Sequence, residues 1–67
     1  MSLFSTTALL MMLEGIRGAQ FIDLIFERQG LLAPYGTKRH SDWKRQGDAL
    51  QAELQRRAVR FAPLIWN

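Results

Sequence analysis

The chain has 67 residues with no cysteine and one histidine, His40, which indicates a single domain and excludes disulfides, thiolate metal sites and a multi-histidine metal site. A domain this short buries roughly 60% of its unfolded surface, so oligomerisation or binding to another protein is the remaining route to stability. The net charge of +3 is uneven, because residues 1–31 hold two basic against three acidic side chains and residues 32–67 hold seven against three. The basic second part favours an acidic protein, nucleic acid or an anionic membrane as a partner.

The first predicted element is a helix over residues 6–29. Hydroxyl side chains at residues 5–7 can accept from the free amides of its first turn, and Gly30 can adopt the left-handed conformation that closes a helix. The apolar run 8–13 follows no basic residue and leads directly into charged residues, so it predicts neither a secretory signal nor a transmembrane span. We therefore expect a soluble protein of the cytoplasm.

Helix 6–29 is apolar around nearly its whole circumference. One face carries Met11, Gly15, Gly18, Ala19, Ile22, Ile25 and Phe26, and a second carries Leu10, Leu13, Phe21 and Leu24. A helix of this kind is normally buried on more than one side, so we expect a second copy of the chain or a foreign protein on the side that the hairpin leaves free. The small residues Gly15 and Ala19 leave two interpretations open. They admit another helix backbone closely or, as we favour, they accommodate Trp43 or Phe61 of the same chain.

Residues 30–41 form the predicted connection between two helices. Pro34 and Gly36 carry turn chemistry, because proline fixes one dihedral angle and glycine allows positive φ. Ser41 is the predicted N-cap of the next helix, and Asp42 is favourable beside the positive end of that helix.

The second predicted helix covers residues 42–62 and carries one narrow apolar stripe. The stripe recurs at steps of three or four residues and consists of Trp43, Gly47, Leu50, Leu54, Ala58 and Phe61. Pro63 ends the helix, because proline disfavours helical geometry in the residue before it. The remaining residues 63–67 form an apolar tail. Such a stripe needs an apolar partner, so the helix is expected to pack on helix 6–29.

These elements predict an all-α fold, a two-helix antiparallel hairpin that spans residues 1–67 as one domain. We expect the hairpin to form a homodimer through helix 6–29, which makes a four-helix assembly. The residues predicted in the core of the hairpin or the dimer are Met11, Gly15, Ala19, Ile22, Phe26, Trp43, Leu50, Leu54 and Phe61.

The sequence carries no catalytic, cofactor-binding or metal-binding signature, so we predict a protein that is not an enzyme. His40 is the only imidazole and is interpreted as a solvated loop residue. Glu14 and Asp23 lie nine residues apart on different parts of the helix surface, and we interpret them as groups that serve solubility. Gly15 and Gly18 lie within a helix rather than between a strand and a helix, so they do not form a phosphate-binding loop.

A small non-enzymatic inhibitor or adaptor that binds another protein fits these residue types best. Tryptophan, tyrosine and arginine carry interface energy most often, and the predicted contact residues are Tyr35, Arg39, Arg45, Arg56 and Trp66. Two alternatives stay open. Basic clusters at residues 38–45 and 56–60 would meet phosphate groups in a small nucleic-acid-binding protein. The basic amphipathic helix 42–62 would lie on a membrane surface.

The whole-chain arrangement resembles a class of small phage-encoded helical proteins that bind and disable a host regulator. The resemblance is carried by the cysteine-free hairpin of residues 6–29 and 42–62, the basic second helix, and the aromatic residues Phe4 and Trp66 near the two ends. The class includes anti-activators of quorum-sensing transcription factors and inhibitors of pilus-assembly ATPases. The resemblance implies a homodimer in the host cytoplasm that covers a surface of a host protein, such as a transcription regulator.

Overall fold

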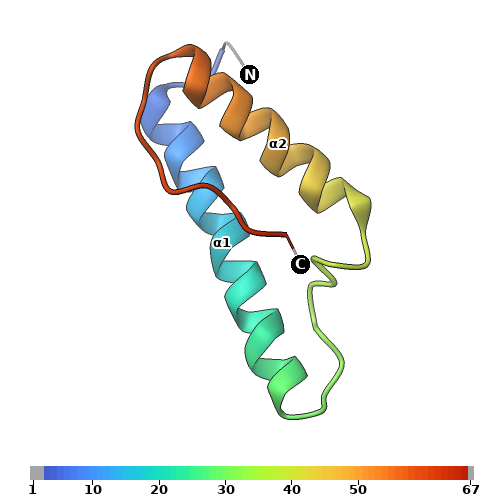
Figure 1. The fold of residues 1–67 in the computed structure, drawn as a ribbon. Helices are drawn as coiled ribbons and strands as arrows, with labels where there is room; N and C mark the ends of the chain where they lie inside the picture. Colours follow the sequence, from blue (N-terminus) through green and yellow to red (C-terminus); the bar gives the residue numbers. More distant parts are fainter. Residues whose placement is uncertain (1–2, 67) are drawn as a thin grey trace.

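The computed structural model describes residues 3–66 and folds them into two helices, α1 (Thr6–Arg28) and α2 (Ser41–Arg56), with no strand among these residues. The two helices, with no strand in the described residues, confirm the prediction of an all-α fold. They run in opposite directions and pack against each other (Figure 1). The molecule is elongated, at 40 × 18 × 17 Å, because α1 continues past the beginning of α2 alongside the connection between them. Residues 1, 2 and 67, which the predicted domain includes, lie outside the described residues.

Local chemistry determines both ends of α1. The Ser5 hydroxyl accepts a hydrogen bond from the Ala8 amide at 3.1 Å, which satisfies one of the free donors of the first turn. At the other end Gly30 has a φ of 75°, and the Leu31 amide donates to the Phe26 carbonyl at 2.9 Å. The helix ends one residue before the predicted boundary, with the glycine closure that the sequence indicates.

The second helix differs from the prediction at both ends, since α2 begins at Ser41, one residue early, and ends at Arg56, six residues before the predicted end. His40 holds the N-cap position, so the prediction that Ser41 caps this helix is wrong, and Pro63 does not end it. Ala58 adopts a left-handed conformation with a φ of 59°, and the Val59 amide donates to the Leu54 carbonyl at 3.0 Å. A glycine usually makes this closure, so the alanine here makes it without a recognisable sequence signal. Ala58 and Phe61 therefore do not continue the helical stripe.

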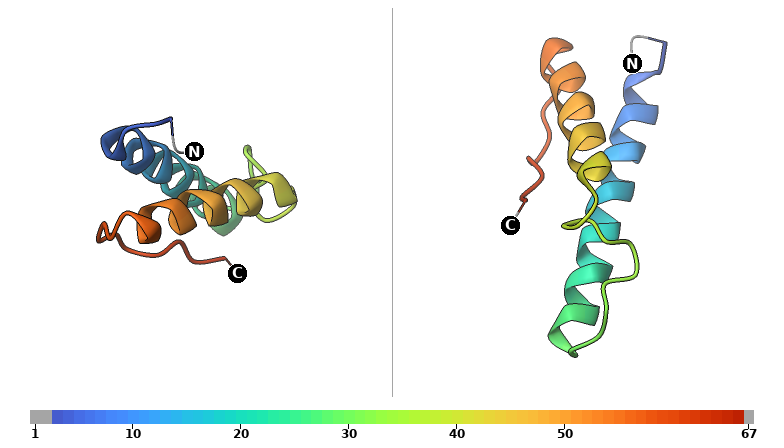
Figure 2. Two further views of the ribbon diagram at one scale, coloured as in Figure 1. Left: turned by 90° about the horizontal axis from the view of Figure 1, so that it is seen from above. Right: turned by 90° about the vertical axis from the view of Figure 1, so that its right-hand side faces the viewer.

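The segment after α2 turns back and runs along the hairpin as a C-terminal strap, residues 57–66 (Figure 2). The Leu64 amide donates to the Gln51 side chain of α2 at 2.9 Å, and the Gln20 side chain of α1 donates to a strap carbonyl at 3.0 Å. A Cβ on Gly47 of α2 would lie only 2.8 Å from Leu64 Cδ1, so the strap packs directly on the backbone of α2. The apolar tail is therefore a third layer of the fold that both helices hold in place.

The core lies where α1, α2 and the strap meet. It consists of the buried residues Leu9, Leu13, Ile16, Leu50, Leu54 and Leu64, with Leu10, Trp43, Val59, Phe61 and Trp66 packed at its edge. Among the predicted core residues, Ala19, Leu50 and Leu54 are buried, and Trp43 and Phe61 are partly buried.

Four predicted core residues lie outside the core of the single chain, namely Met11, Gly15, Ile22 and Phe26. The side of α1 that faces α2 carries Leu9, Leu13 and Ile16 instead. Because α1 is apolar around nearly its whole circumference, the helical period alone does not select the side that meets α2. These four residues were predicted for the core of the hairpin or of the dimer, so their place in a dimer core stays a prediction.

Candidate protein-interaction surface

A buried carboxylate holds the connection between the helices to α1. Asp23 is 1% exposed, and its two oxygens accept hydrogen bonds from the Tyr35 amide at 2.9 Å and from the Thr37 amide and hydroxyl at 2.8 and 2.7 Å. Burial raises the pKa of Asp23, but these hydrogen bonds outweigh burial and leave the pKa below its usual value. The expectation that Asp23 serves solubility is therefore wrong, because this side chain fixes the shape of the connection.

The connection presents an ordered surface, which we call the loop end, residues 31–39. The Trp43 indole donates to the Tyr35 carbonyl at 3.1 Å, and the two rings meet edge to face with centroids 6.1 Å apart. Leu32 is 74% exposed, and the Tyr35 ring and Arg39 also face solvent. The loop end thus combines exposed apolar, aromatic and arginine side chains on a backbone that α1 and α2 both hold.

A second carboxylate joins the elements at the opposite end of the hairpin. Glu53 is largely buried, and it accepts from Arg56 at 2.6 Å and from Arg57 at 2.8 Å. Arg57 also donates to the Thr6 hydroxyl of α1 at 3.2 Å, which ties the end of α2 to the beginning of α1. The hydrogen bonds from the two arginines lower the pKa of Glu53 from 4.5 to about 2.

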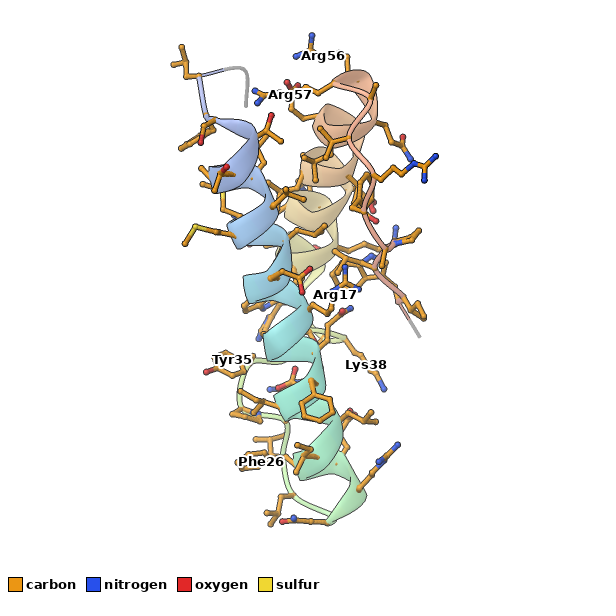
Figure 3. All side chains as sticks on the ribbon, turned by 90° about the vertical axis from the view of Figure 1, so that its left-hand side faces the viewer. Arg17, Phe26, Tyr35, Lys38, Arg56 and Arg57 are labelled. Atoms are coloured by element: carbon orange, nitrogen blue, oxygen red, sulfur yellow. The ribbon has the colours of Figure 1, made fainter. Side chains whose placement is uncertain are left out.

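The five predicted contact residues do not form one surface. Tyr35 and Arg39 belong to the loop end, and Arg45 pairs with a neighbouring carboxylate on α2 at 3.2 Å. Arg56 lies at one end of the long axis, far from Tyr35 (Figure 3). Trp66 belongs to the strap and packs at the edge of the core. Only the loop-end pair therefore lies on a shared exposed segment.

Most of the positive charge is neutralised within the chain. Of the nine basic residues, six make ion pairs with carboxylates: Arg17, Lys38, Lys44, Arg45, Arg56 and Arg57. The cluster at residues 38–45 is therefore largely paired, which weakens its attraction for nucleic acid. In the cluster at residues 56–60, Arg56 and Arg57 share the one carboxylate of Glu53.

An apolar surface is left uncovered on the side of α1 that faces away from the core. We call it the outer face, and it consists of Met11, Gly15, Gly18, Phe21, Ile22 and Ile25. Met11 is 70% exposed, Phe21 61% and Ile22 37%. The chain as a whole exposes 4870 Å², whereas a compact monomer of 7.7 kDa exposes roughly 4,300 Å². The elongated shape of the molecule contributes to this excess, and so do the exposed apolar side chains of the outer face.

The two glycines of the outer face are not required by contacts within the chain. Apart from the adjoining backbone of α1 itself, a Cβ added at Gly15 or at Gly18 would meet no heavy atom within 4 Å. The favoured interpretation, in which Gly15 accommodates Trp43 or Phe61 of the same chain, is therefore wrong. Gly15 instead borders a hollow of about 310 Å³, whose other lining residues are Met12, Ile16, Trp43, Gln46 and Leu50.

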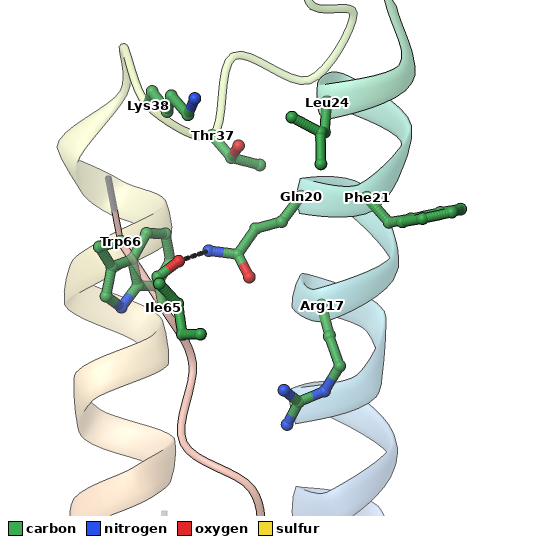
Figure 4. A pocket seen from close by; sticks show the side chains of 8 residues that line it. All are labelled: Arg17, Gln20, Phe21, Leu24, Thr37, Lys38, Ile65 and Trp66. Atoms are coloured by element: carbon green, nitrogen blue, oxygen red, sulfur yellow. Dashed lines mark hydrogen bonds between the residues drawn. The ribbon is translucent and has the colours of Figure 1, made fainter.

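A second hollow, of about 370 Å³, lies between α1 and the end of the strap (Figure 4). Its lining residues are Arg17, Gln20, Phe21, Leu24, Thr37, Lys38, Ile65 and Trp66. Gln20 donates to the Ile65 carbonyl, Arg17 donates to a strap carbonyl at 2.6 Å, and Lys38 pairs with a carboxylate of α1 at 3.4 Å. These three polar side chains hold the strap and the connection in place, so contacts within the chain already account for their presence in the hollow.

Within residues 3–66 no three acidic or histidine side chains gather in a group that could hold a metal ion. Neither α1 nor α2, in the part of the chain that the structure describes, combines the length and apolar character needed to cross a membrane. The geometry defines a strapped helical hairpin whose outer face and loop end expose apolar side chains. Comparison with family models, with curated proteins and with solved structures found no match for this chain.

Proposed function

We propose that this protein works by binding other proteins, without catalysing a reaction, and that it forms a homodimer through α1 with four helices in the assembly. The observation that carries the proposal is the outer face, where exposed apolar side chains line the long helix of a small chain. Burying apolar surface against protein gains about 25 cal/mol per Å², so contiguous exposed surface of this kind typically marks a binding site.

The loop end is the proposed contact for a target protein. Leu32, Tyr35 and Arg39 are exposed there, and they include the residue types that carry interface energy most often. Because Asp23 already fixes the backbone of the loop end, binding would cost little additional ordering. Following the resemblance to phage-encoded inhibitors, the target would be a bacterial host regulator, such as a quorum-sensing activator or a pilus-assembly ATPase, that the protein covers in the host cytoplasm.

Protein binding accounts for the geometry better than the two alternatives. The apolar stripe of α2 that would meet a membrane includes Leu50 and Leu54, and both are buried in the core. Basic side chains that would meet nucleic acid are mostly paired with carboxylates. The outer face and the loop end, in contrast, are available to another protein.

Sedimentation over a range of protein concentrations tests the homodimer. The disrupting variant is Ile22→Lys on the outer face, and the matched control is Ala52→Lys at an exposed position of α2. We expect the wild type and Ala52→Lys to sediment as dimers, and Ile22→Lys to sediment as a folded monomer. For the target, we expect purified candidate regulators to bind the wild type and Arg56→Ala but not Leu32→Ser. A wild-type chain that stays monomeric and binds no regulator would contradict the proposal.

A further inference from the structure

We infer that the second copy docks antiparallel on the outer face of α1, about a twofold axis near Gln20. In this register Ile22 and Ile25 of one protomer lie over the partner's Gly18 and the partner's Gly15. The inference rests on the proposed homodimer and specifies how its two copies are arranged.

The spacing of the outer face is that of a coiled-coil seam. Met11, Gly15, Gly18, Ile22 and Ile25 follow one another at steps of four, three, four and three residues. This 4–3 repeat places one row of side chains along the line where two helices meet. The core residues Leu9, Leu13 and Ile16 do not belong to this repeat, so α1 carries one seam for its own chain and another for a partner.

The two glycines provide space for the two isoleucines. Apart from the adjoining backbone of α1, neither Gly15 nor Gly18 has an atom of its own chain within 4 Å of an added Cβ, although glycine is unfavourable inside a helix compared with alanine. The pairs 15 and 25, and 18 and 22, are both centred on residue 20. One twofold axis there places both isoleucines of each copy on both glycines of the other, as the self-complementarity of a twofold interface requires. The hollow beside Gly15 gives the partner's Ile25 additional room.

The charges beside the seam select the antiparallel orientation. Glu14, Phe21 and Arg28 lie seven residues apart along one edge of the outer face. The pairs 14 with 28, and 21 with 21, are centred on residue 21, one residue from the axis, so their levels differ by only about 3 Å along the helix. Glu14 therefore lies within reach of the partner's Arg28, and Phe21 within reach of the partner's Phe21. Glu14 is paired with Arg17 in its own chain, but its side chain is 64% exposed and open to a second cation, and Arg28 has no ion pair within residues 3–66. In a parallel dimer the Glu14 and Arg28 levels would be about 21 Å apart, too far to pair.

Because the chain has no cysteine, single-cysteine variants and a short bis-maleimide crosslinker can measure the register. We expect Phe21→Cys to crosslink to its own copy, because that position lies beside the axis. We expect Met11→Cys not to crosslink, because the two Met11 positions are about 27 Å apart in the antiparallel register. Crosslinking of Met11→Cys would overturn the antiparallel register and leave the homodimer intact. A dimer in which neither variant crosslinks would place the interface elsewhere, and a monomer would overturn the homodimer as well.

A charge exchange provides an independent test. Glu14→Arg and Arg28→Glu each place like charges across the seam in their own homodimers, so we expect each variant alone to dimerise at least about tenfold more weakly than the wild type. Mixing the two variants makes both pairs attractive again, and the mixture should recover the wild-type dimer. If mixing restores no affinity, the pairing of Glu14 with the partner's Arg28 is wrong.

The glycines are tested by Gly18→Ala. An alanine at this position meets nothing within its own chain, so it should raise the melting temperature of the monomer measured at high dilution. The same methyl group would obstruct the partner's Ile22, so it should weaken the dimer about tenfold. A variant that strengthens both the monomer and the dimer would show that no helix approaches Gly18 closely.

Discussion

Replacing Asp23 by alanine removes the buried carboxylate that holds the connection to α1. Three hydrogen bonds are lost together, from the Tyr35 amide and from the amide and hydroxyl of Thr37. Thr37 is itself buried, so its amide and hydroxyl would be left without a partner in a place that water reaches poorly. The Tyr35 amide is only partly buried and can turn towards water.

The size of the effect follows from these three bonds. Hydrogen bonds to a charged group contribute about 1.5–3 kcal/mol each to the free energy of unfolding. The alanine variant loses these contributions, but it no longer has to bury a charge, so the net loss of stability is smaller than their sum. We therefore expect Asp23→Ala to cost about 3 kcal/mol. The total stability of a 67-residue domain is about 3–10 kcal/mol, so this is a large fraction of it. Asp23→Asn keeps one accepting oxygen and should cost about 1–2 kcal/mol, and Thr37→Val loses only the hydroxyl bond and should cost about 1 kcal/mol.

Urea unfolding followed by circular dichroism, at one protein concentration and pH 7, measures these differences. Hydrogen exchange of the Tyr35 and Thr37 amides provides the local measurement, and both should exchange faster in Asp23→Ala than in the wild type. The order Asp23→Ala, Asp23→Asn, Thr37→Val is as informative as the sizes. An alanine variant within 1 kcal/mol of the wild type, with unchanged protection of both amides, would refute the role of Asp23.

Three further predictions follow from the core, the strap and the buried pair. Gly47→Ala places a Cβ 2.7 Å from Trp66 Cζ2 and 2.8 Å from Leu64 Cδ1, so it should displace the strap, cost about 1–3 kcal/mol and change tryptophan fluorescence; an unchanged spectrum and urea midpoint would contradict this. Because the pKa of Glu53 is low, its ionised carboxylate stabilises the fold fully above pH 4.5, and this contribution should disappear as the pH falls towards 2. We expect Glu53→Gln to be less stable than the wild type at pH 7 and about equally stable at pH 2. A difference in the free energy of unfolding that does not change with pH would argue against the ion pairs of Glu53. Leu54→Asp puts an unpaired charge at a fully buried position and should abolish the helical circular dichroism signal; an unchanged melting curve would show that this core is wrong.

The ends of α1 could be predicted from sequence because they depend on local chemistry. Ser5 accepts from an amide three residues on, and Gly30 closes the helix through its own positive φ. Both signals act within a few residues, so they do not depend on what the helix packs against. The end of α2 has no such signal, because Ala58 adopts a conformation that alanine rarely takes.

The side of α1 that enters the core could not be predicted, because both sides are apolar. The choice depends on α2 and the strap, which cover Leu9, Leu13 and Ile16. The role of Asp23 was equally hidden, because an acidic residue within a helix normally faces water. The sequence held one clue, because Pro34 and Gly36 indicate a turn and the backbone amides of a turn need acceptors. In the structure Asp23 is the acceptor for the amide of Thr37, which follows this turn.

The position of the strap determines which surfaces remain for a partner. Leu64 and Trp66 cover the backbone of α2 at Gly47, so these two side chains of the apolar tail already pack within the chain, whereas Ile65 between them stays exposed. The strap does not reach the glycines of α1, so Gly15 and Gly18 remain uncovered. A glycine inside a helix is less favourable than an alanine, and on a free surface nothing compensates for this cost. At Gly47 the absence of a side chain is explained within the chain, because a Cβ there would lie only 2.8 Å from Leu64 Cδ1. By the same logic, the proposed second copy would approach Gly15 and Gly18 with similar closeness, and the isoleucines that would complement these glycines lie on the same helix.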